Sequence, residues 1–201
     1  MRLFTKFLLS ATSPSQFPAA TVPEFAFLGR SNVGKSSLIN SLLGEKAAKV
    51  SASPGRTRAI NFFALLDAPS AQQAQMVFAD LPGYGYAKIS KSISAEWPGF
   101  INPYLEQRPN LALCVCLIDS NIPVQRSDAQ LIAALRGMGR PFLAVGTKVD
   151  RLSGNERTKA AARLKQGLEL EDLLLCSAKT GAGMKDLWSR LFAVCEDQGS
   201  K

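Results

Sequence analysis

The sequence predicts an α/β fold of three layers, with a six-stranded, mostly parallel sheet, one antiparallel edge strand and helices on both faces. Three observations support it. Short apolar runs alternate with stretches of helical pattern, which is typical of a parallel sheet. The run 111–118 is apolar throughout, as expected for a strand covered on both faces. Two strand-like runs, 60–66 and 75–79, follow each other closely, which predicts an antiparallel pair.

The remaining elements are expected in chain order. Strands are expected at 24–28, 60–66, 75–79, 111–118, 141–145 and 173–176, and helices at 36–43, 125–137, 154–167 and 184–195. Another helix should run to about Gln107 and end or kink at Pro98. Ser153 and Glu156 form a capping box at the start of the helix 154–167.

No linker interrupts the chain, so we expect one domain at 23–195, with an N-terminal extension at 1–22 and a tail at 196–201. No apolar run approaches the length needed to cross a membrane. The apolar patch Phe7-Leu8-Leu9 is too short for a signal peptide, which favours a cytoplasmic protein. Because residues 1–22 contain no acidic residue, organellar targeting remains the alternative.

Composition excludes several kinds of catalysis and suggests a kind of partner. The 201 residues contain no histidine, which rules out a Ser-His-Asp triad, a Cys-His dyad and a histidine-ligated metal. The net charge is +8, which favours a polyanionic partner such as nucleic acid. The alternative, that the charge only maintains solubility, stays open.

A phosphate-binding loop is predicted between the first expected strand and helix. The segment fits the pattern G-x-x-x-x-G-K-[ST] and reads Gly29, Arg30, Ser31, Asn32, Val33, Gly34, Lys35 and Ser36. In such a loop the backbone N–H groups surround phosphate oxygens at a helix N-terminus. Lys35 would contact the β- and γ-phosphates, and the Ser36 hydroxyl would bind Mg²⁺.

Two further segments complete the predicted phosphate site. Asp80, Leu81, Pro82 and Gly83 follow the strand 75–79. Asp80 can hold Mg²⁺ through water, and the N–H of Gly83 can reach the γ-phosphate. Thr57 lies in a polar loop and can reach Mg²⁺ when that loop closes. Without the loop 29–36, Asp80 would be an ordinary turn residue, and Thr57 taken by itself is an ordinary polar loop residue.

A base-binding site is predicted after the strand 141–145. Thr147, Lys148, Val149 and Asp150 match [NT]-K-x-D, in which the aspartate accepts from N1–H and the 2-amino group of guanine. Adenine presents neither donor, so Asp150 argues against an ATPase. Ser177, Ala178 and Lys179 would complete the pocket with backbone N–H groups, although alone they are also typical of a helix-entry loop.

The order of these segments resembles that of the Ras-like G-domain GTPases, which are P-loop NTPases. The segments 29–37, 54–57, 61–63 and 80–88 are similar to those of the YihA/YsxC/EngB family, over residues 23–195. The resemblance implies binding of GTP and GDP, slow Mg²⁺-dependent hydrolysis of GTP, and a role in assembly of the large ribosomal subunit. It also implies a requirement for normal cell division and septation.

The resemblance carries site residues over to this chain. It implies Ser36 and Thr57 as Mg²⁺ ligands, and nucleotide contacts from the segments 29–36, 55–59, 80–83, 147–150 and 177–179. The segment 55–59 consists of Gly55, Arg56, Thr57, Arg58 and Ala59. Lys35, Thr57 and Gly83 would act in catalysis. The chain departs from the family after Asp119, where residues 120–122 are Ser-Asn-Ile and members often have Arg-His-Pro.

Hydrolysis is expected to be slow without a partner. Tyr84 stands where many G domains have a glutamine that orients the attacking water. Tyrosine cannot offer the same pair of donor and acceptor. Asn32 is a candidate K⁺ ligand, as in related GTPases that potassium activates.

Two basic clusters suggest how a polyanion would be bound. The first lies in the expected switch loops 45–59 and 81–95 and comprises Lys46, Lys49, Arg56, Arg58, Lys88 and Lys91. The second follows one helix and comprises Arg151, Arg157, Lys159, Arg163 and Lys165, which could equally be a solvated face. We therefore expect a monomeric GTP-dependent switch that binds ribosomal RNA. The alternative is a GTP-binding interaction module of the division machinery, in which hydrolysis is incidental.

Overall fold

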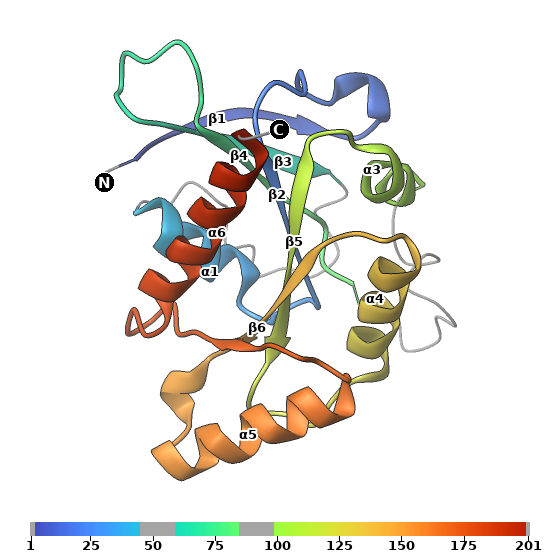
Figure 1. Ribbon diagram of the computed structural model, residues 1–201, viewed down its shortest axis with the longest axis vertical. Helices are drawn as coiled ribbons and strands as arrows, with labels where there is room; N and C mark the ends of the chain where they lie inside the picture. The colour runs from blue at the N-terminus through green and yellow to red at the C-terminus, as the bar shows by residue number, and fades with distance from the viewer. Residues whose placement is uncertain (1–2, 45–58, 85–98, 200–201) are drawn as a thin grey trace.

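The computed structural model describes residues 3–44, 59–84 and 99–199 (Figure 1). Within them, one sheet runs in the order β1-β3-β4-β2-β5-β6-β7. Its strands are β1 (Phe4–Ala11), β2 (Glu24–Gly29), β3 (Ile60–Leu66), β4 (Met76–Asp80), β5 (Leu111–Asp119), β6 (Phe142–Thr147) and β7 (Leu174–Leu175). The helices are α1 (Lys35–Leu43), α3 (Ile101–Gln107), α4 (Arg126–Gly137), α5 (Gly154–Gly167) and α6 (Met184–Gly199).

Helices cover both faces of the sheet, which confirms the predicted fold class. Successive side chains of a strand point to opposite faces, so β2 contributes to two separate cores. Phe25 and Phe27 pack in the core beneath α1 and α6. Ala26 and Leu28 pack in the core beneath α3 and α4. Figure 1 shows α1 and α6 on one side of the sheet and α3 and α4 on the other. Both faces of β2 are therefore buried, as its continuous apolar sequence requires.

The sheet has one strand more than predicted, because the N-terminal segment joins it. Strand β1 pairs antiparallel with β3, from Phe4 opposite Leu66 to Ala11 opposite Ile60. The antiparallel pairing of β3 with β4 is as expected. The register of β1 shifts between Phe7 and Leu9, which disturbs the alternation of apolar and polar residues. Without that alternation the sequence pattern does not predict a strand here.

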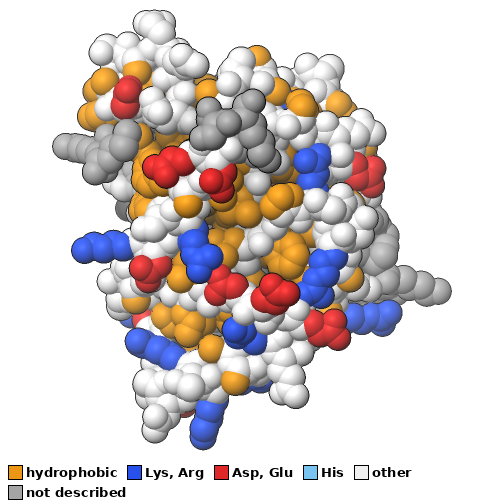
Figure 2. All heavy atoms as spheres, viewed as in Figure 1, with side chains coloured by type: hydrophobic (Ala, Val, Ile, Leu, Met, Phe, Trp, Pro, Cys, Tyr) orange, Lys and Arg blue, Asp and Glu red, His pale blue; other side chains and the backbone are white. Residues whose placement is uncertain are grey.

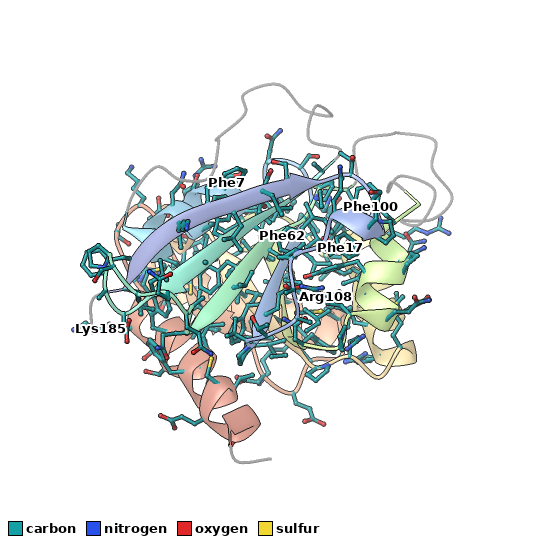
Figure 3. The ribbon with its side chains drawn as sticks, turned by 90° about the horizontal axis from the view of Figure 1, so that it is seen from above. Phe7, Phe17, Phe62, Phe100, Arg108 and Lys185 are labelled. Carbon is teal, nitrogen blue, oxygen red and sulfur yellow. The ribbon has the colours of Figure 1, made fainter. Side chains whose placement is uncertain are left out.

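A buried ion pair fixes the segment that joins β1 to β2. Arg108, just after α3, donates from Nε and Nη2 to the carboxylate of Glu24 at 3.0 and 2.8 Å, and Nη2 also donates to the carbonyl of Pro18 at 2.8 Å. The Tyr104 hydroxyl donates to the same carboxylate at 2.7 Å. The guanidinium lies 5.8 Å from the centre of the Phe17 ring (Figure 3). The segment before β2 is thus tied to α3.

Local signals in the sequence agree with the observed helix ends. The capping box of α5 is present, with the backbone N–H of Ser153 donating to Glu156 at 2.8 Å. Pro103 lies in the first turn of α3, where a missing N–H breaks no helical hydrogen bond. Pro98, the other expected helix breaker, lies outside the described residues. No helix in the described part of the chain is long and apolar enough to span a bilayer.

Replacing Arg108 by alanine should lower the free energy of unfolding by about 3–5 kcal/mol, because it leaves the carboxylate of Glu24 buried without its cation. Urea unfolding at neutral pH measures this change. The matched control is Arg190→Ala, which removes an ion pair to Asp172 whose side chains are both more than half exposed. That control should change stability by less than about 1 kcal/mol. Equal effects of the two substitutions would contradict a stabilising role for the buried pair.

Candidate functional site

The predicted site lies where the carboxyl ends of the parallel strands meet. Strands β2, β4, β5, β6 and β7 are parallel neighbours, so the loops that follow them emerge at one edge of the sheet. This edge is where α/β sheets of this kind bind ligands. The loops after β2 and β6 are in direct contact, since the Thr147 hydroxyl donates to the carbonyl of Val33 at 2.7 Å.

The loop from 29 to 36 has a backbone that depends on its two glycines. Gly34 has φ of +103° and begins α1, a conformation that side chains with a Cβ rarely adopt. At Gly29, a Cβ would lie 2.7 Å from Cγ1 of Val33. No side chain caps the N-terminus of α1, so its first N–H groups remain directed at the loop. The segment therefore offers backbone donors at a helix N-terminus, which suits an anion.

Lys35 and Asp80 come together within this loop. The Nζ of Lys35 forms an ion pair with Oδ1 of Asp80, and the two side chains are only 12% and 6% exposed. Ser36 follows Lys35 in the first turn of α1 and is half-buried. A carboxylate and a hydroxyl are hard oxygen donors, which fits Mg²⁺. Lys35 would exchange Asp80 for phosphate oxygens when an anion enters.

The loop after β4 lies directly against the loop after β2. The backbone N–H of Ser31 donates to the carbonyl of Tyr84 at 2.9 Å. A Cβ on Gly83 would lie 3.1–3.3 Å from atoms of Ser31, so this position favours glycine. Leu81 and Pro82 are buried, while Gly83 is exposed beside the loop 29–36. The predicted contact of Gly83 with a terminal phosphate is thus compatible with its position.

The side chain of Tyr84 points into the protein. It is 1% exposed, and its hydroxyl donates to Oδ1 of Asp128 in α4 at 3.1 Å. Burial raises the pKa of Asp128 to about 6, although the hydrogen bond from Tyr84 and the charge of Arg30 act in the opposite direction. Tyr84 therefore anchors the loop after β4 to α4.

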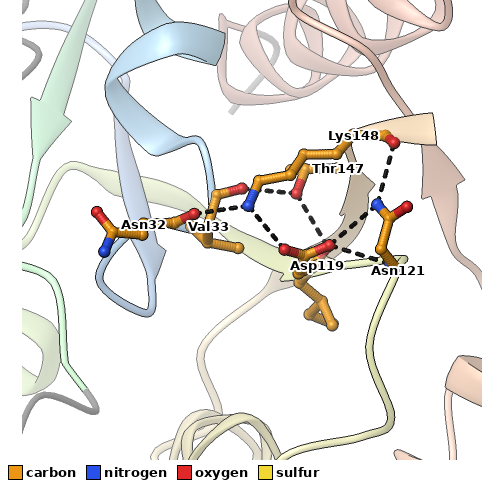
Figure 4. Close-up of polar contacts among 7 residues, drawn as sticks. Asn32, Val33, Asp119, Asn121, Thr147 and Lys148 are labelled. Atoms are coloured by element: carbon orange, nitrogen blue, oxygen red, sulfur yellow. Dashed lines mark hydrogen bonds and ion pairs between the residues drawn. The ribbon is translucent and has the colours of Figure 1, made fainter. Parts of the chain in front are cut away.

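Lys148 connects the loops that follow β2, β5 and β6. Its Nζ donates to the carbonyl of Asn32 at 2.7 Å and pairs with Oδ2 of Asp119 at 2.7 Å (Figure 4). Burial raises the pKa of Asp119, but hydrogen bonds from Lys148 and Asn121 outweigh burial and hold it below its usual value. Asp119 is therefore a carboxylate at neutral pH and a fixed partner for the lysine. No sequence motif identifies Asp119 as a site residue, since one acidic residue at a strand end has no distinctive pattern.

Asp150 is held in place by the last predicted segment. The hydroxyl of Ser177 donates to Oδ1 of Asp150 at 2.7 Å. The same hydroxyl oxygen accepts from the backbone N–H groups of Lys179 and Thr180, both at 3.2 Å. The Ser177 hydrogen bond lowers the pKa of Asp150, which is therefore a carboxylate at neutral pH. The hydrogen bond between Ser177 and Asp150 thus joins the segments 147–150 and 177–179. In the second segment, Ala178 is half-buried and Lys179 is exposed.

Part of the predicted site lies outside the described residues. The described residues do not include Gly55, Arg56, Thr57 and Arg58. They do include Ala59, which is half-buried just before β3. The basic cluster of the expected switch loops also lies entirely outside the described residues. Its members are Lys46, Lys49, Arg56, Arg58, Lys88 and Lys91.

The second basic cluster has a partly structural role. All five of its residues are exposed, and Figure 2 shows basic side chains spread around the lower part of the molecule, where Figure 1 places α5. Arg157 donates from Nε to the carbonyls of Val149 and Leu152, both at 3.0 Å. Arg163 donates to the carbonyl of Ser120 at 2.8 Å. Two of the five arginines and lysines therefore brace loops of the candidate site.

Comparison with known proteins gives a consistent result. The family model described as "50S ribosome-binding GTPase" matches residues 24–148. A protein of Acidobacterium capsulatum named "Probable GTP-binding protein EngB" is 66% identical over 98% of this chain and 93% of its own length. One of the same name from Koribacter versatilis is 53% identical over 96% and 94%.

Solved structures share the fold at lower sequence identity. A crystal structure titled as a probable GTP-binding protein engB has a TM-score of 0.64 and 22% identity, over 87% of this chain and 99% of that one. A structure of Era in complex with MgGDPNP and nucleotides 1506–1542 of 16S ribosomal RNA has a TM-score of 0.68 and 24% identity, over 86% and 56%. These likenesses establish the fold.

The pair of Tyr84 and Asp128 predicts a pH-dependent difference in stability. The carboxyl of Asp128 titrates near pH 3.8 when unfolded and near pH 6 when folded. Between these values the folded state binds more protons, so its free energy of unfolding falls as the pH rises and stays low above pH 6. Asp128→Asn removes the charge and keeps an oxygen that accepts from Tyr84. From pH 4 to 7.5 the variant should therefore gain about 2–2.5 kcal/mol relative to the unmodified protein.

Urea unfolding of the two proteins across this pH range measures the difference. Asp172→Asn, at an exposed ion pair, serves as the control and should show little of this trend. A difference between the Asp128 variant and the unmodified protein that does not vary with pH would contradict the raised pKa.

Proposed function

The chain belongs to the EngB family of GTPases, and on that premise we propose that it is a GTP-dependent switch in assembly of the large ribosomal subunit. The observation that carries the nucleotide assignment is the position of Asp150. Ser177 orients its carboxylate, and Lys148 ties the same loop to the carbonyl of Asn32. A carboxylate fixed in this way can accept from both guanine donors at a set distance from the phosphates.

The proposed nucleotide site uses the residues predicted from the sequence. The loop 29–36 and Lys35 bind the phosphates, and Asp150 with the segment 177–179 binds the base. Ser36, Thr57 and Asp80 would hold Mg²⁺, since their oxygen atoms suit this ion. The ion would neutralise charge on the β- and γ-phosphates. Asn32, exposed at the tip of the loop, remains the predicted ligand for K⁺.

Hydrolysis is proposed to be slow in the isolated protein. The hydroxyl of Tyr84 donates to Asp128 in the interior. It therefore does not point toward the loop 29–36, where the phosphates would bind. Lys35 and the N–H of Gly83 then stabilise charge on the γ-phosphate, and Thr57 closes over it. A partner that orders the loop after Gly83 or supplies a group to orient water would raise the rate.

Asp150→Asn should change which nucleotide is bound. The amide can no longer accept from both guanine donors, so the affinity for GTP should fall by roughly 100-fold or more. Xanthine has a carbonyl in place of the 2-amino group, and the new amide N–H can donate to it. Titration with labelled GTP and XTP measures both effects. Asp186→Asn, on α6, is the control, and unchanged affinity for GTP in Asp150→Asn would refute the base site.

Four observations support a ribosomal partner. The net charge of +8 favours a polyanion, and the matching family model is described as ribosome-binding. Era, which shares the fold, was solved with a fragment of ribosomal RNA. Lys159 and Lys165 are exposed on α5 and are available for phosphate contacts. The alternative remains a GTP-binding module of the division machinery, and a role in division and septation is compatible with either.

Sedimentation with ribosomal subunits tests the proposal. The protein is loaded with GDP or with a non-hydrolysable GTP analogue and mixed with isolated subunits at two salt concentrations. We expect comigration with the large subunit in the triphosphate state alone, weakening steeply with salt. Free protein in both states would discard the ribosome as a direct partner and favour the division module.

We further propose that the protein acts as a monomer in the bacterial cytoplasm, with residues 23–195 as its G domain. Strand β1 and the contacts of Pro18 and Arg108 favour a structural role for the segment 1–22 over organellar targeting. In the structure this segment extends the sheet of the G domain.

A further inference from the structure

We propose that Asn121 is a positioning residue that sets the selectivity of this protein for guanine. The inference rests on the proposed function of residues 147–150 as the base site. Asn121 lies in the loop after β5, where no nucleotide contact is expected from the sequence. Its action is indirect and passes through the backbone of Lys148.

The side-chain amide of Asn121 joins two groups that define the base loop. Its Nδ2 donates to Oδ1 of Asp119 at 3.1 Å and to the carbonyl of Lys148 at 3.1 Å (Figure 4). The backbone N–H of Asn121 also donates to Oδ1 of Asp119, at 3.0 Å. Oδ2 of Asp119 in turn pairs with the ammonium of Lys148. The Asn121 amide, the Asp119 carboxylate, and the ammonium and carbonyl of Lys148 therefore form a closed ring. Lys148 is thus held both by its side chain and by its carbonyl.

The backbone of Lys148 needs this support. Its φ is +60°, in the left-handed region that residues other than glycine seldom adopt unless their surroundings impose it. The same carbonyl accepts from the backbone N–H of Arg151 at 3.1 Å, which closes the turn that contains Asp150. The direction of this carbonyl therefore determines where the carboxylate of Asp150 stands. Asn121 fixes that direction from the side of β5.

The loop around Asn121 is itself held rigidly. Arg163 of α5 donates from Nη2 to the carbonyls of Ser120 and Ile122, at 2.8 and 3.1 Å, on either side of Asn121. The backbone N–H of Ser120 donates to the carbonyl of Thr147 at 3.2 Å. The backbone on either side of Asn121 is thus fixed to α5, and its side chain contacts the base loop. Both hydrogens of its side-chain amide are donated, one to Asp119 and one to Lys148.

Asn121→Ala should weaken base recognition and leave the chemistry of hydrolysis intact. Loss of the two amide hydrogen bonds should raise the Kd for GDP and GTP by about 10-fold, through faster dissociation. The ratio of affinities for GDP over IDP should fall several-fold, because IDP lacks the 2-amino group that only a well-placed Asp150 can use. The kcat at saturating GTP should not change, since the phosphate site is untouched.

The measurement is stopped-flow dissociation of fluorescent GDP, with competition by IDP and ADP, on the full chain with Mg²⁺. Gln125→Ala is the matched control, because that amide lies in the same loop and donates to the carbonyl of Pro123. Asn121→Asp, which keeps the shape but has no donor hydrogen and adds a charge beside Asp119, should be at least as defective as the alanine variant.

The outcomes separate this inference from the proposed function. A reduced ratio of GDP over IDP in both Asn121 variants, with kcat and the control unchanged, supports the positioning role. Equal weakening of GDP and IDP would assign Asn121 a merely structural role and overturn the inference, as would unchanged binding. If the unmodified protein binds ADP as tightly as GDP, the base site itself is wrong.

Discussion

The bond between Lys148 and its two partners is the contact on which the candidate site depends. The ammonium of Lys148, which follows β6, donates to the carbonyl of Asn32, which follows β2, and to the carboxylate of Asp119 at the end of β5. One ammonium group therefore connects the ends of three strands. A lysine that is partly withdrawn from water needs such compensation, and the charge-assisted hydrogen bonds supply it. This contact and the hydrogen bond from Thr147 to Val33 together set the distance between the loop 29–36 and the loop 147–150, because the strands below fix only where each loop begins.

A second constraint links the loop after β4 to the helical layer. The backbone of Tyr84 contacts Ser31, and its hydroxyl reaches Asp128 in α4. A change in the position of that loop therefore has to break a buried hydrogen bond to a carboxyl group whose burial is already unfavourable. The position of that loop is therefore coupled to α4 through the side chain of Tyr84.

Much of the fold and of the site could be predicted because their signals are local. The alternation of strands and helices, the loop 29–36 and the segment 147–150 each occupy a few consecutive residues. Parallel strands then bring these segments to one edge without further information. Strand β1 was missed because a register shift removes its alternation. The roles of Asp119 and Asn121, and the inward direction of Tyr84, depend on residues distant in the chain, which leave no pattern in one sequence.

The ion pair between Glu24 and Arg108 also has a consequence for how the chain folds. The two residues are separated by 84 positions, and β1 pairs with a strand that ends at Leu66. During synthesis β1 therefore finds its partner only once Leu66 has appeared, and Glu24 finds its own only once Arg108 has appeared. Contacts at such separation slow folding, because the chain entropy is lost before the contacts form. During synthesis, the carboxylate of Glu24 remains in water and β2 cannot be fully enclosed until Arg108 arrives.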